Sequence, residues 1–233
     1  GGGFEAPVWL GSSLAFYAGD AGDIDGDGDL DIVGQVNNPA GVAFLENNGS
    51  LQFADAQFIE EGVSPTAVRF ADADGDGDQD VFTSGSYEPG LTWYENDAGF
   101  FLEQHVFGES TMDYFRDAFT VEDLDADGDV DIAVAGYQQY EPSRLFINDG
   151  SGAFGAPVNG SPGHGDCLAL CVSDFAGDGD KDIAQSLNTN SIWISLNYSG
   201  SAYQLSGRLY FDANANNQYD TGEPGLPGAQ LVI

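Results

Sequence analysis

Aspartates at alternate positions are the residues of this chain best suited to chemistry, because they recur four times in one pattern. Each ladder has the form D-x-D-x-D-G-x-x-D or a close variant, and the ladders begin at Asp23, Asp72, Asp123 and Asp174. Carboxylates placed two residues apart repel one another, so we expect a cation among them. Calcium, which prefers oxygen ligands, is the predicted ion.

The spacing within each ladder assigns a role to each position of a nine-residue loop. Positions 1, 3, 5 and 9 can supply carboxylates, position 7 a main-chain carbonyl, and glycine at position 6 permits a sharp turn. In the fourth ladder Ala176 stands at position 3, so we expect this site to bind calcium most weakly. The predicted metal-binding residues of the four loops are Asp23, Asp25, Asp27, Asp29, Asp31, Asp72, Asp74, Asp76, Asp78, Asp80, Asp123, Asp125, Asp127, Asp129, Asp131, Asp174, Asp178, Asp180 and Asp182.

Two other structures could produce a single such ladder. One is an Asp-Gly hairpin turn with solvated acids. The occurrence of four ladders in the same register argues against this explanation. The other is a helical EF-hand, which needs a bidentate glutamate at position 12. The residues at position 12 of the four loops are Gly34, Thr83, Val134 and Gln185. None is acidic, and strand-like sequence flanks the loops.

The charge balance limits the classes of partner. The chain has 233 residues with 39 acidic and 5 basic side chains, for a formal net charge of −34. Three ladders hold five acids each and the fourth holds four, so 19 of the 39 acids lie in ladders. The balance stays strongly negative even with calcium bound, which argues against nucleic acid and anionic membranes as partners. No apolar run is long enough to span a membrane.

The flanking sequence repeats together with the ladders, at intervals of 49, 51 and 51 residues. Each unit contains three or four short strand-like runs separated by Gly, Asn, Asp and Pro, without a sustained helical period. A four-stranded sheet of about 50 residues cannot bury both of its faces alone, so neighbouring units must pack on one another. The sequence predicts an all-β fold of propeller blades, with a linear β-solenoid as the rival.

Four positions recur around each ladder. Alanine lies five residues before it, at Ala18, Ala67, Ala118 and Ala169. A β-branched residue follows it, at Ile32, Val81, Ile132 and Ile183. A later strand ends in asparagine, at Asn47, Asn96, Asn148 and Asn197, with an apolar residue three positions earlier. An aromatic is expected to open the next strand, at Phe53, Phe100 and Phe154. The small alanine suits a crowded inner strand near a propeller axis.

The two cysteines lie four residues apart in an apolar run. On an extended strand Cys167 and Cys171 would be about 13 Å apart, which is too far for a disulfide. Both are therefore expected to be small buried apolar residues.

Ladder, spacing and the segment Phe154-Gly155-Ala156-Pro157 resemble the FG-GAP and VCBS repeats of integrin-α-like β-propellers. The resemblance covers residues 1–203 and implies a partial propeller of about four repeats. It also implies that the calcium loops join the first two strands of each blade and that the ions support the structure. Phe4, Ala6 and Pro7 match the end of such a unit, so we expect further repeats upstream in a parent protein.

A different pattern begins after the repeats. Residues 204–233 resemble the start of an Sdr-type B module, a Cna-B-like immunoglobulin-fold domain of calcium-dependent surface stalks. The alternative is a Gly/Asn/Pro-rich linker. The predicted ligands, at EF-hand-like positions 1, 3, 5, 7, 9 and 12, are Asp212, Asn214, Asn216, Gln218, Asp220 and Glu223.

The sequence favours a binding role over catalysis. His105 and His164 lie in dissimilar contexts without a nucleophile motif, so no catalytic activity is expected. The favoured function is calcium-dependent adhesion, or recognition of a glycan or protein, by a bacterial secreted or cell-surface protein. Two alternatives are a non-catalytic part of a secreted polysaccharide-degrading enzyme and an architectural spacer. The tyrosines proposed to contact a ligand are Tyr87, Tyr114, Tyr137 and Tyr140. The sequence leaves the oligomeric state open.

Overall fold

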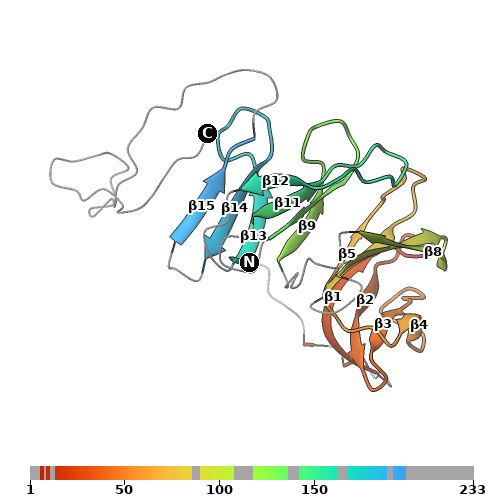
Figure 1. Cartoon of the computed structure of the whole chain (residues 1–233). Helices are drawn as coiled ribbons and strands as arrows, with labels where there is room; N and C mark the ends of the chain where they lie inside the picture. The colour runs from red at the N-terminus through yellow and green to blue at the C-terminus, as the bar shows by residue number, and fades with distance from the viewer. Residues whose placement is uncertain are drawn as a thin grey trace, which may run out of the picture.

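Four antiparallel sheets stand side by side in the computed structural model (Figure 1). The structure describes residues 6–7, 9–10, 14–85, 90–107, 118–135, 142–161, 167–187 and 191–197. Within each described sheet, every strand pairs with the next strand along the chain, which is the meander of a propeller blade. The predicted all-β partial propeller is confirmed, with one sheet for each aspartate ladder.

The sheets have the following strands. The first sheet contains β1 (Ala15–Gly22), β2 (Asp31–Asn37), β3 (Gly41–Leu45) and β4 (Gln57–Glu61). The second contains β5 (Pro65–Ala71), β6 (Asp80–Gly85), β7 (Leu91–Asp97) and β8 (Phe100–Phe107). The third contains β9 (Phe119–Glu122), β10 (Asp131–Val134), β11 (Ser143–Phe146) and β12 (Val158–Ser161). The fourth contains β13 (Cys167–Ser173), β14 (Asp182–Leu187) and β15 (Ser191–Ser195).

The first strand of each sheet contacts the first strand of the next, since β1 packs on β5, β5 on β9 and β9 on β13. These strands are therefore the inner strands predicted to carry alanine. Ala67 of β5 and Ala118, directly before β9, are buried, as expected. Ala169 is exposed, because no described sheet covers that side of the fourth blade.

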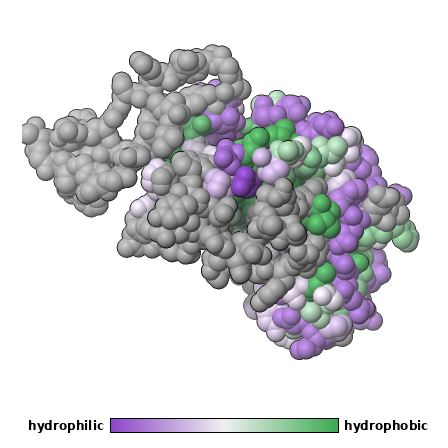
Figure 2. Space-filling view, viewed as in Figure 1, coloured by the Kyte–Doolittle hydropathy of each residue, from purple (hydrophilic) through white to green (hydrophobic). Residues whose placement is uncertain are grey.

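Apolar side chains fill the spaces between successive sheets. Each blade thereby buries apolar faces of its sheet that it could not bury alone. Between the second and third sheets Trp93 stacks on Phe82, with ring centroids 6.3 Å apart, and Phe154 meets both rings at an angle. Both Phe82 and Trp93 are buried. The β-branched residues that follow the ladders lie in the second strands and, in sheets two to four, join these cores. Among the coloured residues of Figure 2, hydrophilic ones cover much of the surface seen in this view.

The aromatic predicted to open the last strand does so in only one blade. Phe100 begins β8, but Phe53 forms an isolated bridge with Asn47, and β4 starts at Gln57. Phe154 lies ahead of β12 and packs into the core between sheets two and three. The prediction was wrong for these two residues because the segment after the asparagine turns before it pairs.

Several predicted features lie outside the described residues. These are the tyrosines proposed for ligand contact, His164, and the whole C-terminal segment with its predicted ligands Asp212, Asn214, Asn216, Gln218, Asp220 and Glu223. The Sdr-type B resemblance therefore stays a prediction. In the part of the chain that the structure describes, no helix is long and apolar enough to cross a membrane.

The two cysteines differ in exposure, so the expectation that both are buried was wrong for Cys171. Both thiols are free, with Cys167 buried and Cys171 exposed. Burial raises the pKa of the Cys167 thiol to about 11. The thiol donates a hydrogen bond to the Ala169 carbonyl at 3.2 Å. A register shift between Cys167 and Ala169 interrupts the alternation along β13, so Cys171 lies on the opposite, open face.

We therefore expect iodoacetamide at pH 8 to alkylate Cys171 rapidly and Cys167 only after unfolding, because the thiolate is the nucleophile. Peptide mass spectrometry over a time course measures both rates. Urea-unfolded protein is the control, in which the two rates should converge. Equal rates in the folded protein would contradict the assignment.

Candidate metal centres

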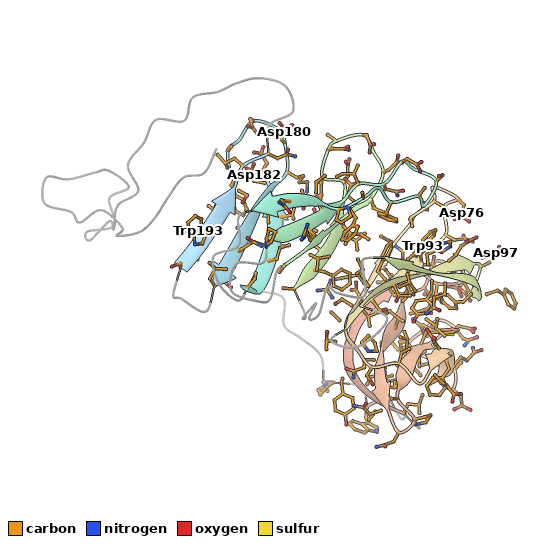
Figure 3. All side chains as sticks on the ribbon, in the orientation of Figure 1. Asp76, Trp93, Asp97, Asp180, Asp182 and Trp193 are labelled. Atoms are coloured by element: carbon orange, nitrogen blue, oxygen red, sulfur yellow. The ribbon has the colours of Figure 1, made fainter. Side chains whose placement is uncertain are left out.

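The aspartate ladders form the connections between the first and second strands of the four sheets. Residues 23–30 join β1 to β2, and the corresponding segments of the other sheets lie at the same end of their blades. In Figure 3 Asp180 and Asp182 lie at this end of the fourth sheet, while Trp193 lies along β15. The meander thus delivers one acidic loop per blade to the same end of the fold.

The glycine predicted at position 6 has a positive φ in every loop, for example 94° at Gly28. Position 4 is also left-handed, with φ of 74° at Gly26, which the sequence analysis did not identify. The signal was present, since glycine occupies this position in three loops. The third loop has Ala126 there at φ 65°, a conformation that costs a residue with a side chain about 1 kcal/mol.

Three groups of carboxylates are close enough to share an ion. In each group one oxygen from every aspartate lies within 4.8 Å of the others. Calcium–oxygen bonds of 2.3–2.6 Å place opposite ligands about that far apart. The groups are Asp23, Asp25 and Asp27 in the first loop, Asp72, Asp74 and Asp80 in the second, and Asp123, Asp125 and Asp127 in the third.

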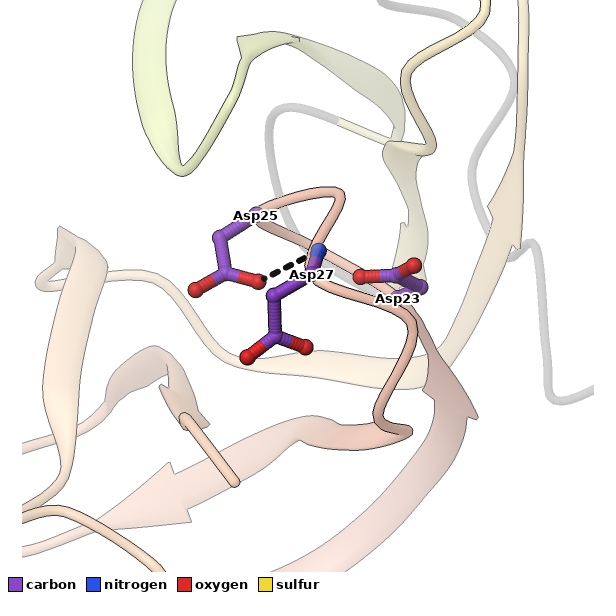
Figure 4. Close-up of side chains that lie close together, drawn as sticks. All are labelled: Asp23, Asp25 and Asp27. Carbon is purple, nitrogen blue, oxygen red and sulfur yellow. Dashed lines mark hydrogen bonds between the residues drawn. The ribbon is translucent and has the colours of Figure 1, made fainter. Parts of the chain in front are cut away.

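In the first loop the three carboxylates converge, and the Asp25 carboxylate also accepts a hydrogen bond from the Asp27 backbone at 3.2 Å (Figure 4). Asp23 accepts the Gly28 N–H with Oδ2 at 2.9 Å. Its other oxygen, Oδ1, is buried without a hydrogen-bond partner. An unpaired buried carboxylate oxygen costs free energy, and a cation bound there would offset it.

Repulsion and burial both disfavour the charged carboxylates. Burial raises the pKa of Asp74 above its usual value, and the neighbouring charges of Asp76, Glu95 and Asp72 add to the effect. Burial also raises the pKa of Asp125, followed by repulsion from Asp127. A divalent cation removes this penalty, so the donor set fits a hard cation such as calcium.

The aspartate at position 9 has a second role that the ladder did not reveal. Asp31 accepts the Ile24 N–H at 2.8 Å with one oxygen and the Asn47 N–H at 2.7 Å with the other. The same two bonds, at 2.8–2.9 Å, are made by Asp80, Asp131 and Asp182. All four carboxylates are buried. This residue ties the loop to the end of the third strand.

Position 9 joins a carboxylate cluster only in the second loop, through Asp80. Burial raises the pKa of Asp80 to about 7, although the backbone N–H groups of Asn96 and Ala73 act in the opposite direction. Burial likewise raises the pKa of Asp31 and Asp131. In the first and third loops the clusters consist of positions 1, 3 and 5.

The predicted residues at position 7 lie beside the clusters. The backbone N–H groups of Asp29, Asp78, Asp129 and Asp180 donate to the position-5 aspartates of their own loops at 2.8–3.2 Å. Asp76, at position 5 of the second loop, accepts the Asp78 N–H. It lies outside the carboxylate group formed by Asp72, Asp74 and Asp80. Asp78 also accepts the Ala98 N–H at 2.9 Å.

The fourth loop differs from the other three. Among the described residues, Asp174, Asp178, Asp180 and Asp182 form no group of three carboxylates within the same distance. Asp174 accepts three backbone N–H groups, from Gly177, Asp178 and Gly179. With Ala176 at position 3, the loop is held by its own hydrogen bonds, and its weaker calcium binding stays a prediction.

The asparagines that end the third strands connect one blade to the previous one. The side-chain amide of Asn96 donates to the Ile24 carbonyl at 2.7 Å, and Asn148 donates to the Ala73 carbonyl at 2.6 Å. Asn197 donates to the Leu124 carbonyl at 2.8 Å. Each acceptor is position 2 of the preceding acidic loop. We call this bond the interblade asparagine bond.

His105 has a packing role in the structure. Its ring stacks on Trp93 with the centroids 4.1 Å apart, and its Nε2 lies 3.4 Å from the Glu95 carboxylate. These contacts explain the position of the His105 side chain as packing and do not indicate a catalytic role.

The model of the FG-GAP-like repeat matches three overlapping segments, residues 23–83, 72–134 and 123–185. Together they cover more than half of the chain. The chain belongs to the FG-GAP-like repeat family. Each match spans one acidic loop and the next, so the FG-GAP-like repeat contains the candidate metal loop.

The FG-GAP-like repeats also resemble a solved structure. A lectin of Agrocybe aegerita, described in work on specific recognition of non-reducing terminal N-acetylglucosamine, matches with a TM-score of 0.52 and 22% identity. The match covers 71% of this chain and 45% of the lectin, so the chain spans less than half of that protein's length. At this identity the likeness establishes the propeller fold. No curated protein matches the chain.

Proposed function

We propose that this chain is a calcium-stabilised, non-catalytic recognition module of an extracellular protein, with a carbohydrate or protein ligand. The observation that carries the proposal is the recurrence of three carboxylate clusters in equivalent loops. Family membership and the propeller fold support it. The chemistry supplied by calcium is neutralisation and cross-linking of each loop.

Calcium fits the loops better than magnesium. Each cluster offers three carboxylates from the protein. Magnesium usually keeps several waters and needs near-octahedral geometry at 2.0–2.1 Å, whereas calcium accepts six to eight oxygens in flexible geometry. The loops lie between strands at one end of the fold, so the proposed role of the ion is structural.

The other end of the blades is the proposed recognition surface. Because successive strands run antiparallel, the connections from second to third strands and from one blade to the next lie opposite the acidic loops. In sequence Tyr87, Tyr114, Tyr137 and Tyr140 fall in these connections. Aromatic side chains and few cations suit a neutral glycan better than an acidic one. The lectin that shares the fold supports a glycan ligand.

A glycan array probed with the labelled chain in calcium buffer tests the proposal, followed by calorimetry with each hit. We expect binding to neutral glycans, with those ending in N-acetylglucosamine as the first candidates. A Tyr137→Ala variant should weaken binding, whereas Asp25→Asn should lower stability and leave binding intact at low temperature. Failure to bind any glycan or extracellular protein would favour a spacer, and shortening of a polysaccharide by the chain would favour an enzyme.

A further inference from the structure

In two of the acidic loops the side chain at position 8 reaches the preceding blade. Gln79 holds this position in the second loop, and its Oε1 accepts the backbone N–H of Asp23 at 2.9 Å. Lys181 holds it in the fourth loop, and its Nζ donates to the Glu122 carboxylate at 2.9 Å. Asp23 begins the first ladder and Glu122 directly precedes the third. Both contacts are therefore made at the start of the preceding acidic loop.

Gln79 differs from the other residues at position 8 because its side chain can accept a hydrogen bond. The first, third and fourth loops have Leu30, Val130 and Lys181 at this position. Leucine and valine have no polar side-chain atom, and the ammonium group of lysine only donates. The second blade therefore offers the loop before it an acceptor that the third and fourth blades do not offer to theirs.

The residue before the first ladder fits this contact. It is Gly22, and a Cβ added there would collide with Gln79 Oε1 and with the Phe70 ring. The residues directly before the other three ladders are Ala71, Glu122 and Ser173. Glycine thus precedes the one ladder whose backbone is approached closely by a glutamine of the next blade.

A second bond from the same blade holds the next residue of the first loop. The side-chain amide of Asn96 donates to the Ile24 carbonyl at 2.7 Å, which is the interblade asparagine bond, and also to the Gln79 carbonyl at 3.0 Å. The N–H of Ile24 donates to Asp31 within the loop. The backbone of Asp23 and Ile24 is therefore held by the second blade at both ends.

We propose that Gln79 is a positioning residue for the first calcium loop, which fixes the backbone that carries the Asp23 carboxylate. The inference rests on the calcium role proposed above. Asp23 belongs to the first carboxylate cluster, and its Oδ1 is buried without a hydrogen-bond partner among the described residues. A ligand that is already held in place loses less conformational freedom when an ion binds, so its affinity for the ion is higher. The first loop is thus complete only with the second blade packed against it.

Replacement of Gln79 by methionine tests the proposal, because methionine keeps the length of the side chain and removes the acceptor. In the isotope-labelled full chain, the amide resonances of Gly28, Gly77 and Gly128 follow the first, second and third loops during titration with EGTA-buffered calcium. We expect Gln79→Met to raise the calcium Kd of the first loop about tenfold, as loss of an outer-shell partner does at other metal sites. The second loop should change less, although Gln79 lies within it.

Two further variants separate positioning from general destabilisation. Gln79→Glu retains an acceptor oxygen and should restore the affinity of the first loop. Val130→Ala shortens the side chain at the same position of the third loop and should leave the Kd of the second loop unchanged, since valine accepts no hydrogen bond. In EDTA, hydrogen exchange at the Asp23 amide should be faster in Gln79→Met than in the wild type or in Gln79→Glu.

The results distinguish this proposal from the calcium role itself. If none of the loop glycines of the wild-type chain responds to calcium, the calcium role fails and the proposal fails with it. If the loops bind calcium but Gln79→Met leaves the first loop unchanged, or weakens all three loops equally, only the positioning role is overturned. Unchanged exchange at the Asp23 amide in Gln79→Met would overturn it as well. Circular dichroism melts confirm that each variant is folded.

Discussion

In excess EDTA the chain is expected to unfold about 15–30 °C below its melting temperature in millimolar calcium. Each occupied site stabilises the folded state by about 2.7 kcal/mol when the calcium concentration is about 100 times Kd. Three carboxylate clusters together contribute about 8 kcal/mol on this basis. For a chain of this size each kcal/mol shifts the melting temperature by about 2–4 °C. Differential scanning calorimetry with and without calcium measures the difference.

Single-residue variants connect this effect to the loops. Asp25→Asn removes one ligand from the first cluster and should abolish about a third of the calcium-dependent shift. Asp55→Asn removes the same charge from an exposed aspartate outside every ladder, and the shift should stay as in the wild type. Magnesium at the same concentration should restore much less of the melting temperature than calcium does. Identical melts in calcium and EDTA would refute the calcium sites altogether.

Repeat spacing was enough to predict the blades and the places of the acidic loops. The reason is physical, because a unit of about 50 residues with alternating strands can bury its apolar faces only against neighbouring units. The loop between the first two strands of each unit then recurs at the same end of the fold. The burial of Val81 and Ile132 on one face of each blade follows from the same alternation. These predictions depended on repeat spacing and strand alternation, which can be read directly from the sequence.

The long-range hydrogen bonds could not be predicted in this way. Asn148 was recognised as a recurrent strand end, but its partner Ala73 lies 75 residues earlier, in another blade. The ladder also presented Asp131 as one more ligand, although its oxygens accept the N–H groups of Leu124 and Asn148. Neither pairing follows from spacing, because both depend on how blades stack. The recurrence of asparagine at one offset was the available signal.

Exposure at the last blade was missed for a related reason. Ile194 occupies a position that is apolar in every repeat, so the repeat pattern predicts its burial, and Cys171 lies in an apolar run that predicts the same. Whether a blade face is buried depends on the neighbouring sheet, and the fourth sheet has no described neighbour on that side.

Asp131→Asn is expected to lower the free energy of unfolding by about 2–3 kcal/mol in calcium and in EDTA alike. The carboxylate is fully buried and accepts two backbone N–H groups at 2.8 Å. An asparagine amide offers one oxygen and one NH2 group, so one N–H donor then faces another donor inside the protein. Urea unfolding followed by circular dichroism measures the change under both conditions.

Asp127→Asn is the matched control, because it removes the same charge from the same loop. Asp127 is exposed, belongs to the carboxylate cluster, and accepts the Asp129 N–H with an oxygen that asparagine retains. In calcium this variant should lose stabilisation, since a ligand is weakened. In EDTA it should be as stable as the wild type or slightly more so, because repulsion on Asp125 is relieved. If the loss in Asp131→Asn also vanished in EDTA, Asp131 would act only as a calcium ligand and the hydrogen-bonding role assigned to it would be wrong.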